Sequence, residues 1–337
     1  MHIKSMLRYL SKRDVYQTVP MYNLNWLRPK KLFRELLGDS IITLVDVGAR
    51  AESVLSVEEL TPLENHINYI GFDADEEEVE RLKSLPSKYF ASQYISSFVS
   101  NRKETVKFKL HYDAGSSSVY DMSESFTRWF RKSPVEKELL LQADSLDNLL
   151  NQDIDFIKLD TQGNEYEILS GAERCLSTAL MVEVEVEFFP IYESQKLAHD
   201  VISKMYNLGY ELLYLNRVFS SSEAFKGISR GQMTFGDALF GLSRDKVLEY
   251  SLEKQKKYCV LLINYGHIDF AFDIYNANPN LQQYCGTLGR FFDKANKNSS
   301  KVSRVIKFFV DKIVFILLHI RKTNGLFSDS DRSWPIR

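Results

Sequence analysis

Three aspartates follow short apolar segments of the kind that form buried strands. Asp46 ends the run that begins at Ile41, and Asp73 and Asp160 end two similar runs further along the chain. Open α/β sheets bind their ligands outside the carboxyl ends of their strands. Carboxylates placed there can accept hydrogen bonds from hydroxyl and ammonium groups, and they can take up a proton. We therefore expect these three side chains to line one ligand site.

The turn after the first of these strands differs from a dinucleotide-binding turn. Such turns read G-x-G-x-x-G, and an acid about 20 residues later binds ribose. Here no glycine follows Gly48 in the next five positions, and Asp73 comes 27 positions after Asp46. An adenosine with a charged amino-acid tail fits this turn better than a pyrophosphate does.

This spacing favours S-adenosylmethionine as the ligand. Gly48 would leave room for the backbone, Asp46 would accept the ammonium group, and Asp73 would accept the ribose hydroxyls. The alternative is that Asp46 caps the following segment and that Asp73 begins the next helix.

A second group of acids alternates with valine in the segment 181–188. Glu183, Glu185 and Glu187 have the period of two that places side chains on one face of a strand. In a covered sheet, aligned carboxylates repel one another unless cations, donors or water meet them. Glu185 and Glu187 are therefore candidates to bind substrate hydroxyls or a divalent cation such as Mg²⁺, with Tyr192 lining the same opening. A solvated edge strand is the alternative.

Strand patterns alternate with helical patterns from position 41 onward. The last two strand patterns, Tyr210–Leu215 and Ala238–Leu242, have no helix between them. This order predicts an α/β fold, a doubly wound and mostly parallel sheet with one antiparallel strand at its end. Segments 89–99 and 105–112 are typical of a hairpin near a sheet edge.

Helical patterns dominate both ends of the chain. Lys30–Leu37 predicts a short helix ended by a glycine, within an N-terminal extension over residues 1–40. Residues 244–322 form a second helical region, in which Val305–Arg321 is apolar enough to pack on the domain or on a second subunit, or to contact a membrane surface. This helix favours a homo-oligomer. Residues 323–337 are expected to be a disordered tail.

Composition bears on the partners and the compartment. The chain of 337 residues has a net charge of −2, so it lacks the concentrated basic face that nucleic-acid binding requires. Three cysteines without metal or redox spacing favour a reducing compartment. No signal-peptide core is present, and the longest apolar run, 313–320, is shorter than the roughly 20 residues of a membrane span. We expect a cytoplasmic protein with no transmembrane span and no nucleic-acid partner.

Five segments together resemble the FkbM family of S-adenosylmethionine-dependent methyltransferases. In chain order, within residues 41–243, they are Asp46–Arg50, Gly71–Asp75, Asp155–Glu165, Glu183–Tyr192 and Arg230–Leu239. The resemblance implies a class I, Rossmann-like sheet of seven strands and O-methylation of a hydroxyl on a sugar, glycan or polyketide acceptor. It places Asp46 and Gly48 at the methionine end of the cofactor, with Arg50 in the cofactor loop, and Asp73 at the ribose.

The resemblance also gives Asp160 a role. In that sheet order the fourth strand lies beside the first, so Asp160 would face the methyl group of the cofactor. Methyl transfer requires mainly that the acceptor oxygen be aligned and its proton accepted. Asp160 is the first candidate for the base or a metal ligand, and Gln162 and Glu165 are polar groups nearby, Gln162 on the substrate side. Alternatively, Asp160 caps the helix that starts near Asn164.

Two other functions fit parts of the sequence. Asp73-Ala74-Asp75 matches the Asp-x-Asp of metal-dependent nucleotide-sugar glycosyltransferases, but that assignment leaves Asp46 and Asp160 without a role. A non-catalytic member that keeps the sheet and serves as an assembly module is the other alternative. The sequence does not choose among acceptors.

Overall fold

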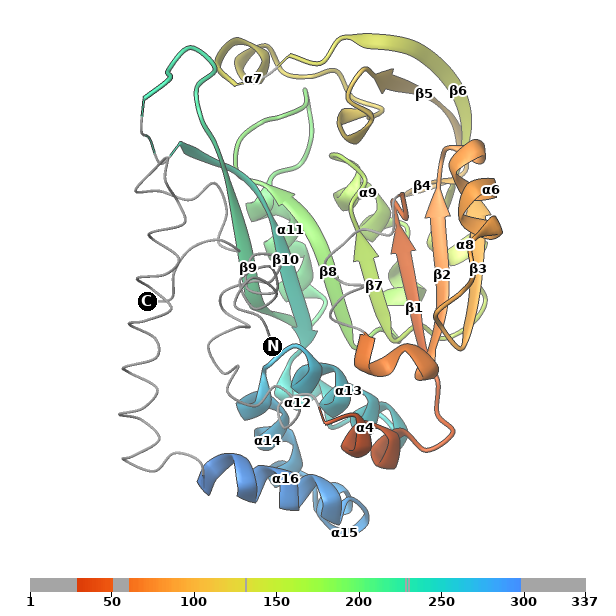
Figure 1. The fold of residues 1–337 in the computed structure, drawn as a ribbon, viewed down its shortest axis with the longest axis vertical. Coiled ribbons are helices and arrows are strands. Elements are labelled where there is room, and N and C mark those ends of the chain that lie inside the picture. The colour runs from red at the N-terminus through yellow and green to blue at the C-terminus, as the bar shows by residue number, and fades with distance from the viewer. Residues whose placement is uncertain (1–28, 51–60, 131, 228, 230, 298–337) are drawn as a thin grey trace, which may run out of the picture.

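A seven-stranded sheet forms the centre of the molecule (Figure 1). The structure is a computed structural model that describes residues 29–50, 61–130, 132–227, 229 and 231–297. The strands run in the order β3-β2-β1-β7-β8-β10-β9. Their bounds are β1 (Ile42–Val47), β2 (Ile67–Asp73), β3 (Ala91–Ser96), β7 (Phe156–Leu159), β8 (Met181–Glu187), β9 (Tyr210–Ser220) and β10 (Gln232–Leu242).

Strand directions confirm the predicted fold class and correct one detail. Strands β3, β2, β1, β7 and β8 pair in parallel, whereas β10 is antiparallel to both β8 and β9. The sheet is therefore mostly parallel with one antiparallel strand, as expected. That strand lies inside the edge strand β9 and not at the edge, because β10 turns back from β9 and inserts beside β8.

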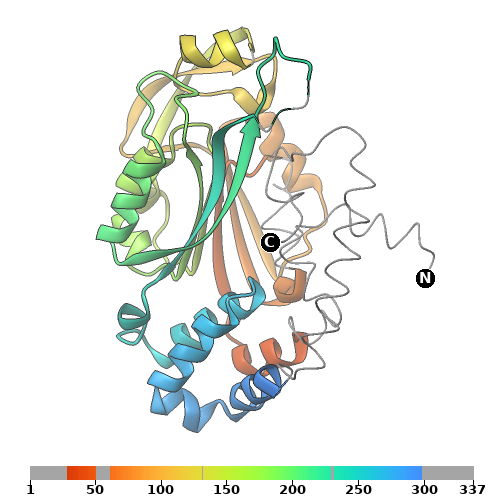
Figure 2. The ribbon, with the colours of Figure 1, turned by 90° about the vertical axis from the view of Figure 1, so that its left-hand side faces the viewer.

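Buried side chains explain why the central strands form. All four residues of β7 are buried, and so are all residues of β1 except Thr43. Helices α9 (Glu165–Ser170), α10 (Glu173–Leu176) and α11 (Ala198–Asn207) follow β7 and β8 in the chain, and Figure 2 shows the green helix α11 along one side of the sheet. The carboxyl ends of β1, β2, β7 and β8 all point to the same end of the molecule (Figure 1).

A smaller sheet and a helix lie beyond those strand ends, at the top of Figure 1. The sheet contains β4 (Phe98–Ser100), β5 (Glu104–His111) and β6 (Val135–Ser145) in the order β4-β6-β5. The predicted hairpin of segments 89–99 and 105–112 is wrong, because β3 joins the main sheet and β5 pairs with β6. Strand β6 begins with the exposed residues 135–138, and its three consecutive leucines, 139–141, do not show the alternation typical of a half-buried strand. The short elements α7 (Glu124–Trp129) and η3 (Ala114–Ser116) complete this region.

Helices gather at the opposite end of the sheet, around the amino ends of the strands (Figure 1). They are α4 (Lys30–Leu37), α12 (Arg244–Val247), α13 (Leu252–Asn264), α14 (Ile268–Ala277), α15 (Pro279–Tyr284) and α16 (Gly286–Lys297). The predicted helix Lys30–Leu37 is confirmed, and Gly38 ends it with a φ of 56°. The three remaining elements are η2 (Thr61–His66), α6 (Glu76–Ser84) and α8 (Leu146–Leu149).

Ion pairs attach the C-terminal helices to the sheet. Lys254 and Lys257 of α13 lie 2.8 and 3.0 Å from the carboxylate of Asp155, just before β7. One hydrophobic core contains residues of α4, the sheet and α13. The predicted boundaries after residues 40 and 243 stay a prediction, and the core is continuous across them.

Several predictions concern residues outside the described ranges. They are residues 1–28 of the N-terminal extension, the apolar helix 305–321 with its role in an oligomer, and the tail 323–337. Among the helices that are described, none combines the length and the apolar character needed to cross a bilayer.

Candidate active site

Three charged side chains form a row across the middle of the sheet. Asp46 of β1 is paired in register with Lys158 of β7, and Lys158 is paired with Glu183 of β8. Residues opposite one another on neighbouring strands project from the same face of a sheet. The acidic face predicted for β8 therefore meets a cation on the adjacent strand.

Lys158 is the centre of a buried ionic cluster. Its Nζ atom lies 3.4 Å from Oδ1 of Asp46 and 3.5 Å from Oδ2 of Asp160, and its side chain is 4% exposed. Burial lowers the pKa of Lys158, but the carboxylates of Asp46, Asp160, Glu183 and Asp237 outweigh burial, so the pKa is raised. The side chain is therefore an ammonium ion at neutral pH.

Asp46 is held by protein partners on both carboxylate oxygens. Lys158 occupies Oδ1, and the hydroxyl of Tyr69 donates to Oδ2 at 2.7 Å. The Asp46 side chain is 1% exposed. Burial and the charge of Asp46 raise the pKa of Tyr69, which keeps that hydroxyl protonated. Each carboxylate oxygen of Asp46 thus has a protein partner, and the contact of Asp46 with a cofactor stays a prediction.

Gly48 lies where β1 meets the end of β7. Its φ is +86°, and a Cβ atom there would lie 2.0 Å from the carbonyl oxygen of Asp160. The amides of Gly48 and Ala49 both donate to the carbonyl of Phe72 at 2.9 Å. A side chain at position 48 would therefore separate the two strand ends that carry the predicted site.

Asp73 lies at the end of β2, next to an ion pair between two loops. Its Oδ1 accepts from the amide of Asp75 at 2.8 Å. Burial raises the pKa of Asp73, and the Asp75 amide and the charge of Arg50 oppose that rise. Arg50 pairs with Asp75, and Asp75 rather than Asp73 caps α6 by accepting from the Glu77 and Glu78 amides.

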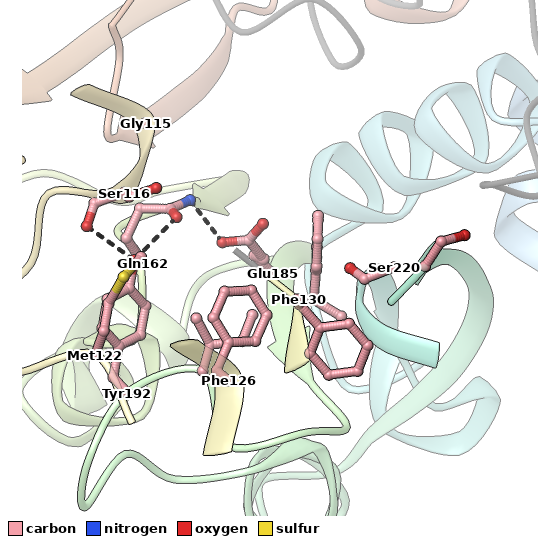
Figure 3. A pocket seen from close by; sticks show the side chains of 12 residues that line it. Gly115, Ser116, Met122, Phe126, Phe130, Gln162, Glu185, Tyr192 and Ser220 are labelled. Carbon is pink, nitrogen blue, oxygen red and sulfur yellow. Dashed lines mark hydrogen bonds between the residues drawn. The ribbon is translucent and has the colours of Figure 1, made fainter. Parts of the chain in front are cut away.

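Gln162 joins two of the predicted catalytic acids. Its Nε2 atom donates to Oδ1 of Asp160 at 3.1 Å and to Oε2 of Glu185 at 2.8 Å. Its φ of 60° is unusual for a residue other than glycine. Backbone conformations of this kind cost free energy and cluster at functional sites. Figure 3 shows the Gln162 amide between the carboxylate of Glu185 and the ring of Tyr192.

Glu165 holds the turn that carries Gln162. One of its oxygens accepts from the amide and hydroxyl of Thr161, at 2.6 and 2.9 Å, and the other accepts from the Gly163 amide at 3.0 Å. Burial is the main cause of the raised pKa of Glu165. The bonds found for Asp160 run to Lys158 and Gln162, so helix capping is not its role within the described residues.

Glu185 and Glu187 lie on a central strand, which excludes the solvated edge considered above. Burial is the main cause of the raised pKa of each residue, followed by neighbouring acids: Asp160 for Glu185 and Glu165 for Glu187. Glu187 is 3% exposed, whereas Glu185 is less buried. A proton is therefore retained on these carboxyl groups well above the pH at which a free glutamate loses it.

A cavity of about 360 Å³ opens above Gln162 and Glu185 (Figure 3). The hydroxyl of Tyr192 lies 3.1 Å from the carbonyl oxygen of Ser116 and 3.4 Å from Oε1 of Gln162, at the cavity wall. Apolar side chains from α7 and the surrounding loops and strands form much of the remaining wall: Met122, Phe126, Phe130, Ile191 and Phe235. The cavity thus has an apolar wall and a polar end.

The structure brings most of the predicted residues to one place. Asp160, Gln162, Glu185 and Tyr192 form a connected group. Asp73 lies two strands away at the end of β2, and Arg50 lies in the loop after β1. Among the described residues, no group of three or more His, Cys, Asp or Glu side chains is arranged to hold a metal ion. The predicted Mg²⁺ has no ligand set there.

Sequence reasoning missed Lys158 and the aromatic residues of α7. A signal for Lys158 existed, because a lone lysine interrupts an apolar strand two positions before Asp160 and so shares its face. For Phe126 and Phe130 no local signal existed, since their place depends on the loop that folds over the strand ends.

A family model matches the part of the chain that contains the end of β1 together with β7 and β8. Residues 46–212 match the family model described as the methyltransferase FkbM domain. A search of curated proteins by sequence gave no match.

Solved structures show weaker similarity. A methyltransferase FkbM from Methylobacillus flagellatus KT is 13% identical, with a TM-score of 0.35 over 59% of this chain and 44% of that chain. The match therefore spans less than half of that protein. Magnesium protoporphyrin IX methyltransferase from Synechocystis PCC 6803, solved with bound SAM, is 11% identical, with a TM-score of 0.34 over 70% of this chain and 82% of that chain. Precorrin-6y C5,15-methyltransferase from Geobacter metallireducens GS-15 is 11% identical, with a TM-score of 0.32 over 63% and 86%. Similarity this low carries no argument about the substrate.

Proposed function

Because the chain belongs to the FkbM methyltransferase family through residues 46–212, we propose that it transfers a methyl group from S-adenosylmethionine to a hydroxyl oxygen of an acceptor. The observation that carries this proposal is the bridge from Asp160 through Gln162 to Glu185, at the floor of the cavity. The acceptor is a sugar, glycan or polyketide-like molecule.

The residues at the strand ends fit the cofactor. Asp73 uses one oxygen for the Asp75 amide, and within the described residues its Oδ2 has no hydrogen bond, so it can accept from a ribose hydroxyl. Asp160 is 34% exposed and can face a positively charged sulfur. Arg50, through Asp75, holds the loop after β1 against the start of α6. Gly48 keeps the ends of β1 and β7 in contact.

Catalysis then requires alignment and removal of one proton. When bound, S-adenosylmethionine supplies a methyl group on a positively charged sulfur. The acceptor oxygen forms a bond to the methyl carbon while the carbon–sulfur bond breaks, and the sulfur keeps the electron pair. Asp160 is the carboxylate that takes the acceptor's proton, since it is 34% exposed and its two oxygens are held in place by Lys158 and Gln162.

Glu185 has a different part in this scheme. Because burial and neighbouring acids raise its pKa, it holds a proton when the site is empty and can donate a hydrogen bond to an acceptor oxygen. Gln162 fixes the separation of Asp160 and Glu185, which pre-organises the site before the acceptor binds. Tyr192 orients the Gln162 amide, and Glu187 extends the polar end.

The residues that line the cavity support a sugar-like acceptor. Apolar and aromatic side chains line one side, and the amide and carboxyl groups lie at the other end. A ring with an apolar face and hydroxyls at its edge, such as a sugar, matches that division. The glycosyltransferase alternative is weaker, because Asp75 of the Asp-x-Asp sequence is engaged as the α6 cap and as the partner of Arg50.

Isothermal titration calorimetry tests the proposal. Titrations with S-adenosylhomocysteine, with UDP-sugars plus Mn²⁺, and with buffer alone should show binding of the first only. Asp73→Ala should lower that affinity by about tenfold or more, because a hydrogen bond to a charged acceptor is lost. Binding of UDP-sugar with Mn²⁺ would favour the glycosyltransferase, and no binding of any ligand would favour the assembly module.

A further inference from the structure

Lys158 does not touch the acceptor in the proposed transfer step, but its ammonium group lies 3.5 Å from Asp160, which does. The side chain of Lys158 comes from the central strand β7 and is 4% exposed, so burying its charge costs free energy unless nearby anions compensate. The two carboxylates closest to Lys158 differ in their exposure to solvent. Asp46 is 1% exposed and has both oxygens occupied, whereas Asp160 is 34% exposed.

The carboxylate of Asp160 is held at both oxygens. Lys158 Nζ lies 3.5 Å from Oδ2, and Gln162 Nε2 lies 3.1 Å from Oδ1. One donor carries a full charge and the other is neutral. Gln162 therefore sets the direction of the carboxylate together with Lys158, and of these two donors only Lys158 carries a positive charge.

Charged and titratable groups face Lys158 from every strand that packs beside it. They are Asp46 on β1, Asp160 at the end of β7, Glu183 on β8 and Asp237 on β10. Tyr69 on β2 contacts the cluster through its hydrogen bond to Asp46. Without the ammonium, Asp46 and Asp160 would lose the cation that now lies 3.4 and 3.5 Å from them, and closely spaced acids share protons.

Building on the proposed methyltransferase activity, we propose that Lys158 is a positioning residue that holds Asp160 as an oriented anion at the reacting end of the cofactor site. Asp46 in turn fixes Lys158, and Tyr69 fixes Asp46. These contacts connect the buried charges of the sheet to Asp160 at the end of β7, where the ligand would bind.

Sinefungin tests this inference without any turnover. It carries an amine where S-adenosylmethionine carries its methylated sulfur, so its affinity reports the charge at Asp160. In the wild type, calorimetric affinity for sinefungin should change little between about pH 6 and 8.5. In Lys158→Met the affinity should rise by about tenfold over that range, because closely spaced acids that have lost their cation share protons at the lower pH and release them as the pH rises, which restores the negative charge that attracts the amine. The pH slope is the readout, since removing Lys158 also removes a repulsion that does not depend on pH.

Matched variants separate this role from general stability. Lys254→Met removes another lysine from a buried ion pair, 2.8 Å from Asp155 at the far end of β7. It should lower the melting temperature and leave the pH slope unchanged. Lys158→Arg should keep the wild-type slope, and Lys158→Gln provides the uncharged variant if the methionine variant does not fold.

The outcomes are distinct. A wild-type slope in both uncharged variants, with sinefungin still bound, would overturn the role of Lys158 and leave the methyltransferase proposal intact. If the wild type binds neither sinefungin nor S-adenosylhomocysteine, the proposed function fails, and the role of Lys158 fails with it. A steeper slope in Lys158→Met, but not in Lys158→Arg or Lys254→Met, supports the inference.

Discussion

Gln162 Nε2 donates to Oε2 of Glu185 at 2.8 Å, across the gap between the turn after β7 and strand β8. The same nitrogen donates to Asp160, so a single amide sets the spacing of two acids on neighbouring strands. An amide can do this because it donates two hydrogen bonds and carries no charge of its own.

Gln162→Glu should therefore reduce activity strongly. The new carboxylate has the shape of the amide but cannot donate to Asp160 or Glu185, and it repels Asp160. We expect kcat to fall by about 100-fold, comparable to the loss of a positioned group in general acid–base catalysis. Methyl transfer from radiolabelled S-adenosylmethionine to an accepted substrate measures this. Gln142→Glu on the exposed part of β6 is the control and should retain wild-type kcat; an equal loss in both variants would contradict the role of Gln162.

Gly48→Ala should destabilise the fold. Its φ of +86° strains any side chain, and the Cβ would lie 2.0 Å from the carbonyl oxygen of Asp160. We expect a loss of about 2 to 5 kcal/mol in the free energy of unfolding. Gly38→Ala isolates the backbone contribution, since its φ is +56° and no atom lies within 4 Å of the new Cβ. Its ψ of −119° lies outside the left-handed helical region, so the substitution should cost about 1–3 kcal/mol through the backbone alone. Urea denaturation of the two variants checks this, and equal losses would show that the contact with Asp160 is unimportant.

Stability should fall as the pH rises, and Glu185 should contribute to the fall. The pKa of Glu185 is raised in the folded protein, so the folded state keeps a proton that the unfolded chain loses. The contribution of Glu185 to the free energy of unfolding is fully present below the pKa of the unfolded chain, about 4.3. It is lost as the pH rises from there through the raised pKa of the folded state. Glu185→Gln should flatten the dependence of the melting temperature on pH above about pH 5. Glu187 has a pKa raised in the same direction, so Glu187→Gln should do likewise. If the melting temperature of both variants depends on pH as it does in the wild type, then the pKa of these two groups is not raised by folding.

Tyr69→Phe should weaken the ionic cluster from its far side. The variant keeps the ring that stacks on Tyr89 with centroids 4.8 Å apart, and it removes only the hydroxyl that donates to Asp46. An unsatisfied buried carboxylate oxygen costs about 1–3 kcal/mol. Thermal denaturation should show this loss, whereas Tyr112→Phe, at a side chain that is 77% exposed, should not change the melting temperature. An unchanged melting temperature in Tyr69→Phe would mean that Asp46 does not depend on that hydroxyl.

The sequence alone determined the central strands, the doubly wound class and the place of the candidate acids. These properties are local, because a buried parallel strand is a continuous apolar run, and an acid that ends the run must lie at the carboxyl edge of the sheet. Asp46, Asp73 and Asp160 could therefore be located without coordinates. The segment after Asp160 also carried enough local pattern to place Gln162 beside it.

Only the tertiary structure decided what each acid contacts. Glu183 faces Lys158 because β8 lies beside β7, and that neighbour relation depends on strand order and register rather than on either strand's own residues. The same relation buries Asp46 between Lys158 and Tyr69, and neither contact can be read from the apolar run that Asp46 ends. Strand β6 was missed for the same reason: half of it is exposed, and it is a strand because β4 and β5 pair with it. Contacts between distant segments depend on how the strands and helices pack together, and no periodic pattern in the sequence indicates them.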